Sequence, residues 1–365
     1  MPHLLGMLPS DLAAHLQQHG IVAREDEVRR LLAHTFTSKP EKGHRQRHPV
    51  ARRLQEAVAA VTENDRLEVV ERVTDPADQF VKYLLRSPDG ALSEAVRIPL
   101  HKPGCYSVCL SSQVGCAMQC RFCATGRLGL ARNLAAWEMV SAFLTVRDEA
   151  PGRVTGAVFQ GQGEPLHNYD EVIQAARVLT HSCGAQISAK AITISTVGLV
   201  PQIRRYTAER HPYRLIISLT SALAERRAQL LPVAGRFTLE EVADAIREYA
   251  RACGERVTIA WVLLGGVNSG PEEAEALVRL FADVPLRINL IDVNDARPPE
   301  AGGYVRASDE ERGAFMGHLQ ALRAPIVRRY SGGAGRHAAC GMLASLRLGD
   351  AAQAPDPMPG AHPPR

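Results

Sequence analysis

The chain has 365 residues, and 45% of them are hydrophobic, which is enough to bury the core of one large α/β domain with smaller additions. No run of apolar residues approaches the roughly 18 that a membrane span needs, and the first residues lack the basic and apolar regions of a secretory signal. The net charge of +4 is compatible with a nucleic-acid partner without requiring one. We therefore expect a cytoplasmic protein that has no association with membranes.

The first hundred residues predict a small accessory domain of the α+β type. Ser10 and Asp11 can cap helical segments within 10–35, and a further short helix is expected over 52–62. Alternating apolar residues, interrupted by turn residues, predict the strands 67–71 and 79–84. The accessory domain is expected to span 1–100.

A basic run lies between two of these segments. It holds only one acidic residue, Glu41, beside the basic residues Lys39, Lys42, His44, Arg45, Arg47, His48, Arg52 and Arg53. The run is either a solvated loop that leads into a helix or a patch that contacts phosphates.

From about residue 106, short β-branched runs alternate with helical stretches. The predicted strands are 154–160, 191–197, 214–219, 256–264, 286–293 and 325–330. The predicted helices are 135–149, 168–180, 239–252, 271–284 and 308–323. Repeated strand–helix–strand units imply parallel buried strands, with chemistry at their carboxyl ends.

Two folds satisfy this alternation. One is a partial (β/α)6 barrel of the TIM type, and the other is an open doubly wound sheet; the periodicity alone does not separate them. In either case the core domain is expected over 101–349. A proline-rich tail over 350–365 is expected to be disordered.

Cysteines form the clearest anomaly of the sequence, because five of the eight lie between Cys105 and Cys123. In an unexported protein, clustered thiols indicate metal ligands rather than disulfides. Three close thiolates can hold a [4Fe–4S] cluster and leave one iron open to a substrate or cofactor, and the three are Cys116, Cys120 and Cys123. Structural zinc usually needs a fourth ligand, for which the nearest candidates are Cys105, Cys109 and Cys340. We favour the cluster.

A second motif, Gly161-Gln162-Gly163-Glu164-Pro165, directly follows the predicted strand 154–160. Its glycines allow close approach of the backbone at a strand end, and Glu164 offers an acceptor for a cationic amine. Alone, the motif is weak, because a glycine-rich turn between a strand and a helix is equally compatible with it. Because the motif lies one strand–helix unit after the cysteine loop, it strengthens the prediction of a cofactor site.

These motifs together resemble known enzymes. The Cx3CxΦC spacing, with Phe122 as the aromatic residue, resembles the signature of the radical-SAM superfamily, whose open iron binds S-adenosylmethionine. Further runs resemble the RlmN/Cfr family of radical-SAM RNA adenine methyltransferases, in family order, and these runs are 108–116, 132–134, 163–168, 194–196, 217–219, 288–291 and 339–341. The N-terminal helices also resemble the small N-terminal domain of that family.

The resemblance implies a role for each matching residue. It implies that the cluster ligands are Cys116, Cys120 and Cys123. It implies an S-adenosylmethionine site lined by Gly163, Glu164, Ser195, Ser218, Leu219, Thr220 and Asn294. It further implies that Glu94 accepts a proton, that Cys340 is itself methylated, and that Cys109 resolves the intermediate through a transient Cys109–Cys340 disulfide.

The implied reaction places a methyl group on ring carbon C2 or C8 of an adenine in RNA. Such a carbon is electrophilic, so direct displacement from a sulfonium is blocked. In the family scheme, one S-adenosylmethionine methylates Cys340 and a second yields a radical that abstracts hydrogen from this S-methyl group. The methylene adds to the ring, a base removes the ring proton, and Cys109 attacks Cys340 to release the product.

The implied partners are rRNA, for some members also tRNA, and a reducing electron donor such as flavodoxin; we expect a monomer. The alternative is a radical-SAM methyltransferase with a different, non-RNA substrate. Several positions depart from the family pattern, among them 292–295, which retains Asn294, and 333–337, and several of these positions are expected near the substrate mouth. These departures bear on which RNA is modified more than on the chemistry of the reaction.

Overall fold

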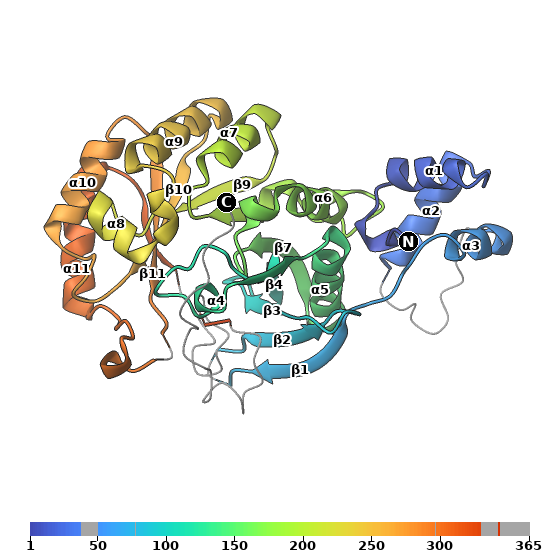
Figure 1. The fold of residues 1–365 in the computed structure, drawn as a ribbon, viewed down its shortest axis with the longest axis horizontal. Coiled ribbons are helices and arrows are strands. Elements are labelled where there is room, and N and C mark those ends of the chain that lie inside the picture. Colours follow the sequence, from blue (N-terminus) through green and yellow to red (C-terminus); the bar gives the residue numbers. More distant parts are fainter. Residues whose placement is uncertain (38–49, 77, 296, 330–341, 344–365) are drawn as a thin grey trace.

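The computed structural model describes residues 1–37, 50–76, 78–295, 297–329 and 342–343 (Figure 1). Three N-terminal helices lie at one side of a large, partly closed barrel. Most of the predicted basic run, the predicted tail and Cys340 lie outside the described residues. Within the described residues, no helix combines the length and the apolar character that crossing a bilayer requires.

The N-terminal helices are α1 (Pro9–Gln18), α2 (Glu25–Thr35) and α3 (Arg52–Ala59). Each repeats apolar residues at helical spacing, as Leu12 and Leu16 do in α1, and these side chains share one small core. Helices are therefore present in both segments where the sequence predicts them.

A single sheet of ten strands runs through the rest of the molecule. Its first four strands are antiparallel, and they are β1 (Glu68–Thr74), β2 (Val81–Arg86), β3 (Leu92–Pro99) and β4 (Cys105–Leu110). The others run parallel to β4, and they are β7 (Arg153–Phe159), β8 (Ile192–Thr196), β9 (Arg214–Ser218), β10 (Val257–Leu263), β11 (Leu286–Asp292) and β12 (Ile326–Arg329). The strands of the accessory segment are thus continuous with those of the core.

The strand order decides between the two predicted folds. From β4 to β12 the order in space follows the order in the chain without a reversal, whereas a doubly wound sheet reverses at a switch point. The main crossover helices cover the outer face (Figure 1), and they are α5 (Ala136–Glu149), α6 (Tyr169–Thr180), α7 (Val200–Glu209), α9 (Leu239–Cys253), α10 (Pro271–Phe281) and α11 (Asp309–His318). The outermost strands β1 and β12 are not neighbours in the sheet order, so the fold is a partial barrel.

The barrel differs from the prediction in two details. The first of its six strand–helix units begins at β4, and the predicted strand over 325–330 follows the sixth unit as an additional strand, β12. Helix α7 was not predicted, because few of its residues are apolar. The buried ones are Val200, Ile203 and Tyr206. Its proline lies in the first turn, where a missing N–H costs little.

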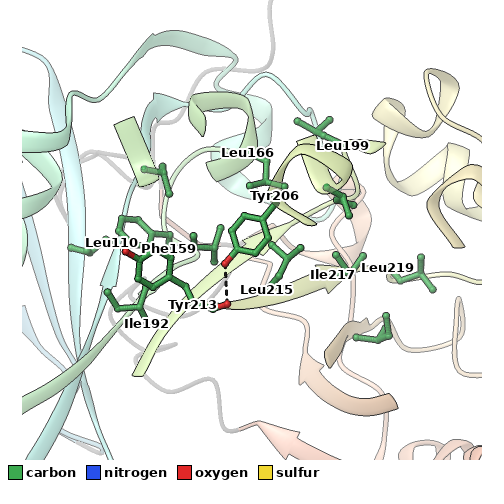
Figure 2. Packing of buried hydrophobic residues seen from close by; sticks show 14 of the residues in the cluster. Leu110, Phe159, Leu166, Ile192, Leu199, Tyr206, Tyr213, Leu215, Ile217 and Leu219 are labelled. Atoms are coloured by element: carbon green, nitrogen blue, oxygen red, sulfur yellow. Dashed lines mark hydrogen bonds between the residues drawn. The ribbon is translucent and has the colours of Figure 1, made fainter. Parts of the chain in front are cut away.

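The barrel core lies between the parallel strands and the helices (Figure 2). Phe159 of β7 and Ile192 of β8 are fully buried there, as expected for strands covered on both faces. The hydroxyl of Tyr206, on α7, donates a hydrogen bond of 2.9 Å to the carbonyl of Tyr213, just before β9. This contact fixes α7 against the sheet and sets where β9 begins.

Candidate active site

The three clustered cysteines lie in a loop between the short paired strands β5 (Gln113–Gly115) and β6 (Leu130–Asn133). Gly115 has φ +78°, and a Cβ there would lie 1.9 Å from the carbonyl oxygen of Gly129. Only glycine suits this position. The N–H of Cys116 then donates to the Gly129 carbonyl at 2.7 Å and closes the base of the loop.

Two further contacts hold the tip of the cysteine loop. The N–H of Arg121 donates to the carbonyl of Leu230, at 3.0 Å, and Leu230 ends helix α8 (Ala224–Leu230). The N–H of Cys123 donates to the carbonyl of Cys120 at 3.1 Å, at the start of the short helix α4 (Ala124–Arg127). The backbone therefore holds the three cysteines in one compact turn.

All three cysteines line one pocket, at the carboxyl ends of the parallel strands. Of the residues implied as a cofactor site, the pocket is also lined by Gly163, Glu164, Ser195, Ser218 and Asn294. Leu219 and Thr220 are not among the lining residues and are fully buried beside them. Lining residues that were not predicted for the cofactor site include Gln160, Thr196, Asp292 and Leu343.

The donor set of the cysteine loop is consistent with an iron–sulfur cluster. Burial raises the pKa of the Cys116 thiol to about 12 and raises that of the Cys120 thiol as well. Bound metal would compensate the charge of such buried thiolates. In a four-iron cube each thiolate binds a different iron, so three thiolates can hold the cluster and leave one iron open.

Glu164 is the buried carboxylate of the pocket. One oxygen accepts the N–H of Leu166 at 2.9 Å, and the other accepts the N–H of Val197, also at 2.9 Å. Burial raises the pKa of Glu164 to about 7, although these hydrogen bonds oppose the shift. The side chain of Thr196 also hydrogen-bonds to this carboxylate. A carboxylate has about four acceptor sites, so Glu164 can still accept a bond from a cationic amine, which would stabilise its charge.

The two glycines before Glu164 are required by close packing. Gly163 has φ +97°, and a Cβ there would lie 2.6 Å from the Cβ of Gln113. A Cβ at Gly161 would lie 2.8 Å from the carbonyl oxygen of Leu110. The turn after β7 can therefore lie directly against the end of β4.

A buried arginine that was not predicted from the sequence contacts Val197, one of the residues that line the pocket. Arg227, on α8, is 1% exposed and donates to the carbonyls of Leu219 at 2.6 Å and Val197 at 2.7 Å. It thereby joins the ends of β8 and β9. Burial lowers its pKa to about 10, so the guanidinium remains charged at neutral pH. Its sequence context, a short arginine-containing helix, gives no signal of this role.

The residues implied to carry the base and the resolving thiol lie on the neighbouring antiparallel strands. Glu94 on β3 is 1% exposed, and Cys109 on β4 is 7% exposed. Cys109 shares a small apolar cluster with Phe80, Val96 and Leu343. Leu343 also lines the pocket, and its carbonyl accepts a hydrogen bond from the hydroxyl of Thr125. Leu343 therefore links the pocket to Cys109.

Lys82, on β2, is a second charged residue that sequence reasoning did not identify. Its Nζ lies 3.0 Å from Oε1 of Glu94, and the two side chains are 5% and 0% exposed. A lysine in a predicted strand ordinarily faces solvent. No local signal reveals this pair, because it depends on how β2 and β3 align.

Comparison with known proteins agrees with this geometry. Residues 110–281 match the Radical SAM superfamily. A "Probable RNA methyltransferase" of Myxococcus xanthus is 48% identical over 315 residues, which are 86% of each chain. A "Probable dual-specificity RNA methyltransferase RlmN" of Leptospira interrogans is 37% identical over 281 residues, 76% of this chain and 78% of the relative.

The solved structure of a radical SAM methyltransferase from Sphaerobacter thermophilus has the same fold. It superposes with a TM-score of 0.85 at 32% identity, covering 95% of this chain and all of that one. The chain therefore belongs to the radical SAM superfamily and, within it, to the family of the RlmN RNA methyltransferases.

Proposed function

We propose that this protein is an S-adenosylmethionine-dependent methyltransferase that modifies an adenine ring carbon, C2 or C8, in rRNA and, as in some members of the family, in tRNA. The observation that carries the proposal is the shared pocket, in which the three cysteines and Glu164 lie together and which Leu343 connects to Cys109. The names of the relatives, which include RNA methyltransferases, support the substrate class.

Cys116, Cys120 and Cys123 would hold one [4Fe–4S] cluster, and three ligands leave one iron open. Glu164 would accept the amine of S-adenosylmethionine, in the pocket that Ser195 and Asn294 also line. Ser218 would line the same site, and the buried Leu219 and Thr220 would shape its wall. When bound, the cluster and S-adenosylmethionine supply the methyl carbon and the radical chemistry that activates it.

Cys340 would carry the transferred carbon on its sulfur. It lies outside the described residues, three positions before Leu343 in the sequence. Leu343 packs with Cys109, which supports a meeting of the two thiols. Glu94 would accept the ring proton, and the unpaired electron of the adduct would return to the oxidised cluster, so that the adduct becomes closed-shell. The Cys109 thiolate would then attack the Cys340 sulfur, forming an S–S bond while the C–S electrons pass to the RNA carbon, which takes up a proton.

The segment 1–100 would contribute RNA contacts, through the N-terminal helices and the basic run that begins at Lys39. The core would be 101–349. Turnover would require a low-potential electron donor such as flavodoxin, which also offers a route to reduce the disulfide. We propose that the protein acts as a monomer.

The test is mass spectrometry of RNA incubated with reconstituted protein, S-adenosylmethionine and reductant. We expect a methyladenine to form with the wild type and not with Cys340→Ala, which should still cleave S-adenosylmethionine. Cys109→Ala should trap a covalent protein–RNA adduct. Cleavage of S-adenosylmethionine without methylation of any cellular RNA by the wild type would contradict the proposal.

A further inference from the structure

Lys82 and Glu94 form an ion pair that is withdrawn from solvent. Nζ and Oε1 lie 3.0 Å apart, and the side chains are 5% and 0% exposed. Among the ion pairs of the described residues, several involve one buried partner, whereas here both partners are almost completely covered. The pair therefore has no bulk water to stabilise either charge.

The register of the sheet explains how the two side chains meet. Lys82 on β2 pairs with Val96 on β3, and Val96 pairs with Cys109 on β4. Paired residues present their side chains to the same face, and Glu94, two residues before Val96, shares that face. Lys82 and Glu94 are thus diagonal neighbours, within reach of a long side chain. The ion pair and Cys109 therefore lie on one face of the sheet.

The backbone of Glu94 is tied to the proposed cofactor site. Its carbonyl accepts a hydrogen bond of 2.6 Å from the hydroxyl of Ser111. The same hydroxyl accepts the N–H of Gln162, at 3.0 Å, within the glycine turn that precedes Glu164. Ser111 thus fixes the main chain of Glu94 to the pocket, while Lys82 holds its side chain.

Stability alone does not explain such a pair. Replacing a buried ion pair by apolar residues is often neutral or stabilising, because the cost of desolvating two ions offsets their attraction. The same face of the sheet carries Val96 and Cys109, which belong to an apolar cluster with Phe80 and Leu343. A carboxyl group in such surroundings takes up a proton unless a cation lies beside it, and a protonated carboxyl cannot act as a base.

We propose that Lys82 is a positioning residue, whose ammonium keeps the Glu94 carboxylate ionised and oriented to accept the ring proton of the RNA. This inference rests on the proposed function. In the step concerned, the C–H bond of the RNA ring breaks and an O–H bond forms on Glu94. Both C–H electrons remain with the ring. Lys82 stays protonated and forms no bond to the substrate.

The test compares Lys82→Gln, Lys82→Arg, Glu94→Gln and the double variant Lys82→Gln/Glu94→Gln. Glutamine can still donate a hydrogen bond to the carboxylate but carries no charge, and arginine restores the charge. Three products are measured, namely 5′-deoxyadenosine, methylated RNA and covalent protein–RNA adduct. Their ratio reports where the reaction stops, which a general loss of structure would not change.

We expect Lys82→Gln to release 5′-deoxyadenosine as the wild type does. Methylated RNA should fall at least about tenfold, a loss no larger than the rate contribution of a positioned base. The covalent protein–RNA adduct should accumulate. Lys82→Arg should recover most of the methylation. In the Glu94→Gln background, Lys82→Gln should have no further effect, because its action passes through the carboxylate. Equal losses in both backgrounds, or wild-type methylation by Lys82→Gln, would overturn the inference.

A wild type that methylates no RNA would instead count against the proposed function, so the two failures are distinct.

A measurement without any Lys82 variant covers the case in which Lys82→Gln does not fold. The infrared difference between wild type and Glu94→Gln should contain the bands of an ionised carboxylate. The carbonyl band of a protonated carboxylic acid in their place would overturn the inference.

Discussion

Two buried glutamates lie in adjacent regions of this molecule, and they are held in opposite ways. Glu164, in the pocket, accepts two backbone N–H groups, and burial raises its pKa to about 7. Glu94, on the antiparallel strands, lies 3.0 Å from the ammonium of Lys82. Among the described residues, no side-chain cation forms an ion pair with the first carboxylate, whereas the second has a cation on the neighbouring strand.

This difference matches two different tasks. A carboxylate that recognises a cationic ligand gains most when the ligand brings the positive charge, since the charge is then compensated only in the complex. A carboxylate that accepts a proton must be ionised before the proton arrives, so its cation must belong to the protein. The following predictions test whether the two regions can be separated in this way.

The largest effect is expected from Cys120→Ala, which removes one proposed cluster ligand. The protein should lose the brown iron–sulfur chromophore after anaerobic reconstitution, and 5′-deoxyadenosine should fall below detection, since two thiolates remain where three are needed. Iron analysis and absorption spectra measure the outcome. Cys253→Ala is the matched control, because Cys253 lies at the end of α9, away from the pocket. Four irons bound to the Cys120 variant would remove this cysteine from the site.

Lys82→Met should have the next largest effect, and it acts on the other region. It leaves the buried carboxylate of Glu94 without its cation, which should lower the free energy of unfolding by about 3–5 kcal/mol. Lys82→Met/Glu94→Gln should recover most of this loss, because no buried charge remains. Urea denaturation of the three proteins measures the effect. A single variant as stable as the wild type would show that the pair does not stabilise the charge of Glu94.

Glu164→Gln should weaken the binding of S-adenosylmethionine by roughly 10- to 100-fold, because a charge-assisted hydrogen bond contributes about 1.5–3 kcal/mol. Calorimetric titration of the reconstituted protein gives the dissociation constant. Glu94→Gln is the control that sharpens the comparison, since it should bind S-adenosylmethionine as the wild type does. Equal weakening by both variants would mean that the two glutamates do not have separate tasks.

The smallest effect is expected at an exposed carboxylate. Desolvation opposes ionisation of Glu209, but hydrogen bonds from Arg205, Tyr169 and His211 lower its pKa to about 2. The side chain is 36% exposed, so Glu209→Gln should cost less than about 1 kcal/mol. Because the folded-state pKa is depressed, this stabilisation is present above the usual value of 4.5 and is lost as the pH falls toward about 2. Denaturation at pH 7 and pH 3 checks this, and a larger cost at pH 3 would contradict it.

The sequence predicted those parts of the site that are encoded locally. Cys116, Cys120 and Cys123 lie in one loop, and Gly163 and Glu164 in one turn, so their spacing alone indicates a shared chemistry. The repetition of strand–helix units was also predicted, although β4, which begins the series, and helix α7 were not among the predicted elements. Local spacing did not decide between barrel and open sheet, because that choice depends on the order of strands in space.

The parts that were missed depend on contacts between distant segments. Lys82 meets Glu94 only because of the register between β2 and β3. Arg227 is recognisable only when the ends of β8 and β9 are seen to converge on it. The role of Leu343 follows from its packing with Cys109, which lies more than two hundred residues earlier in the chain. Periodicity and motif spacing carry no information on such pairs.

The central claim is that the methyl carbon reaches RNA through a protein thiol, and isotope labelling tests it most directly. The protein is supplied with S-adenosylmethionine that carries a trideuterated methyl group, and the methyladenine is analysed by mass spectrometry. The account predicts two deuterium atoms in the new methyl group, because one is removed from the methyl on Cys340 and a solvent proton replaces it. Retention of all three deuterium atoms would indicate direct transfer and would contradict the account.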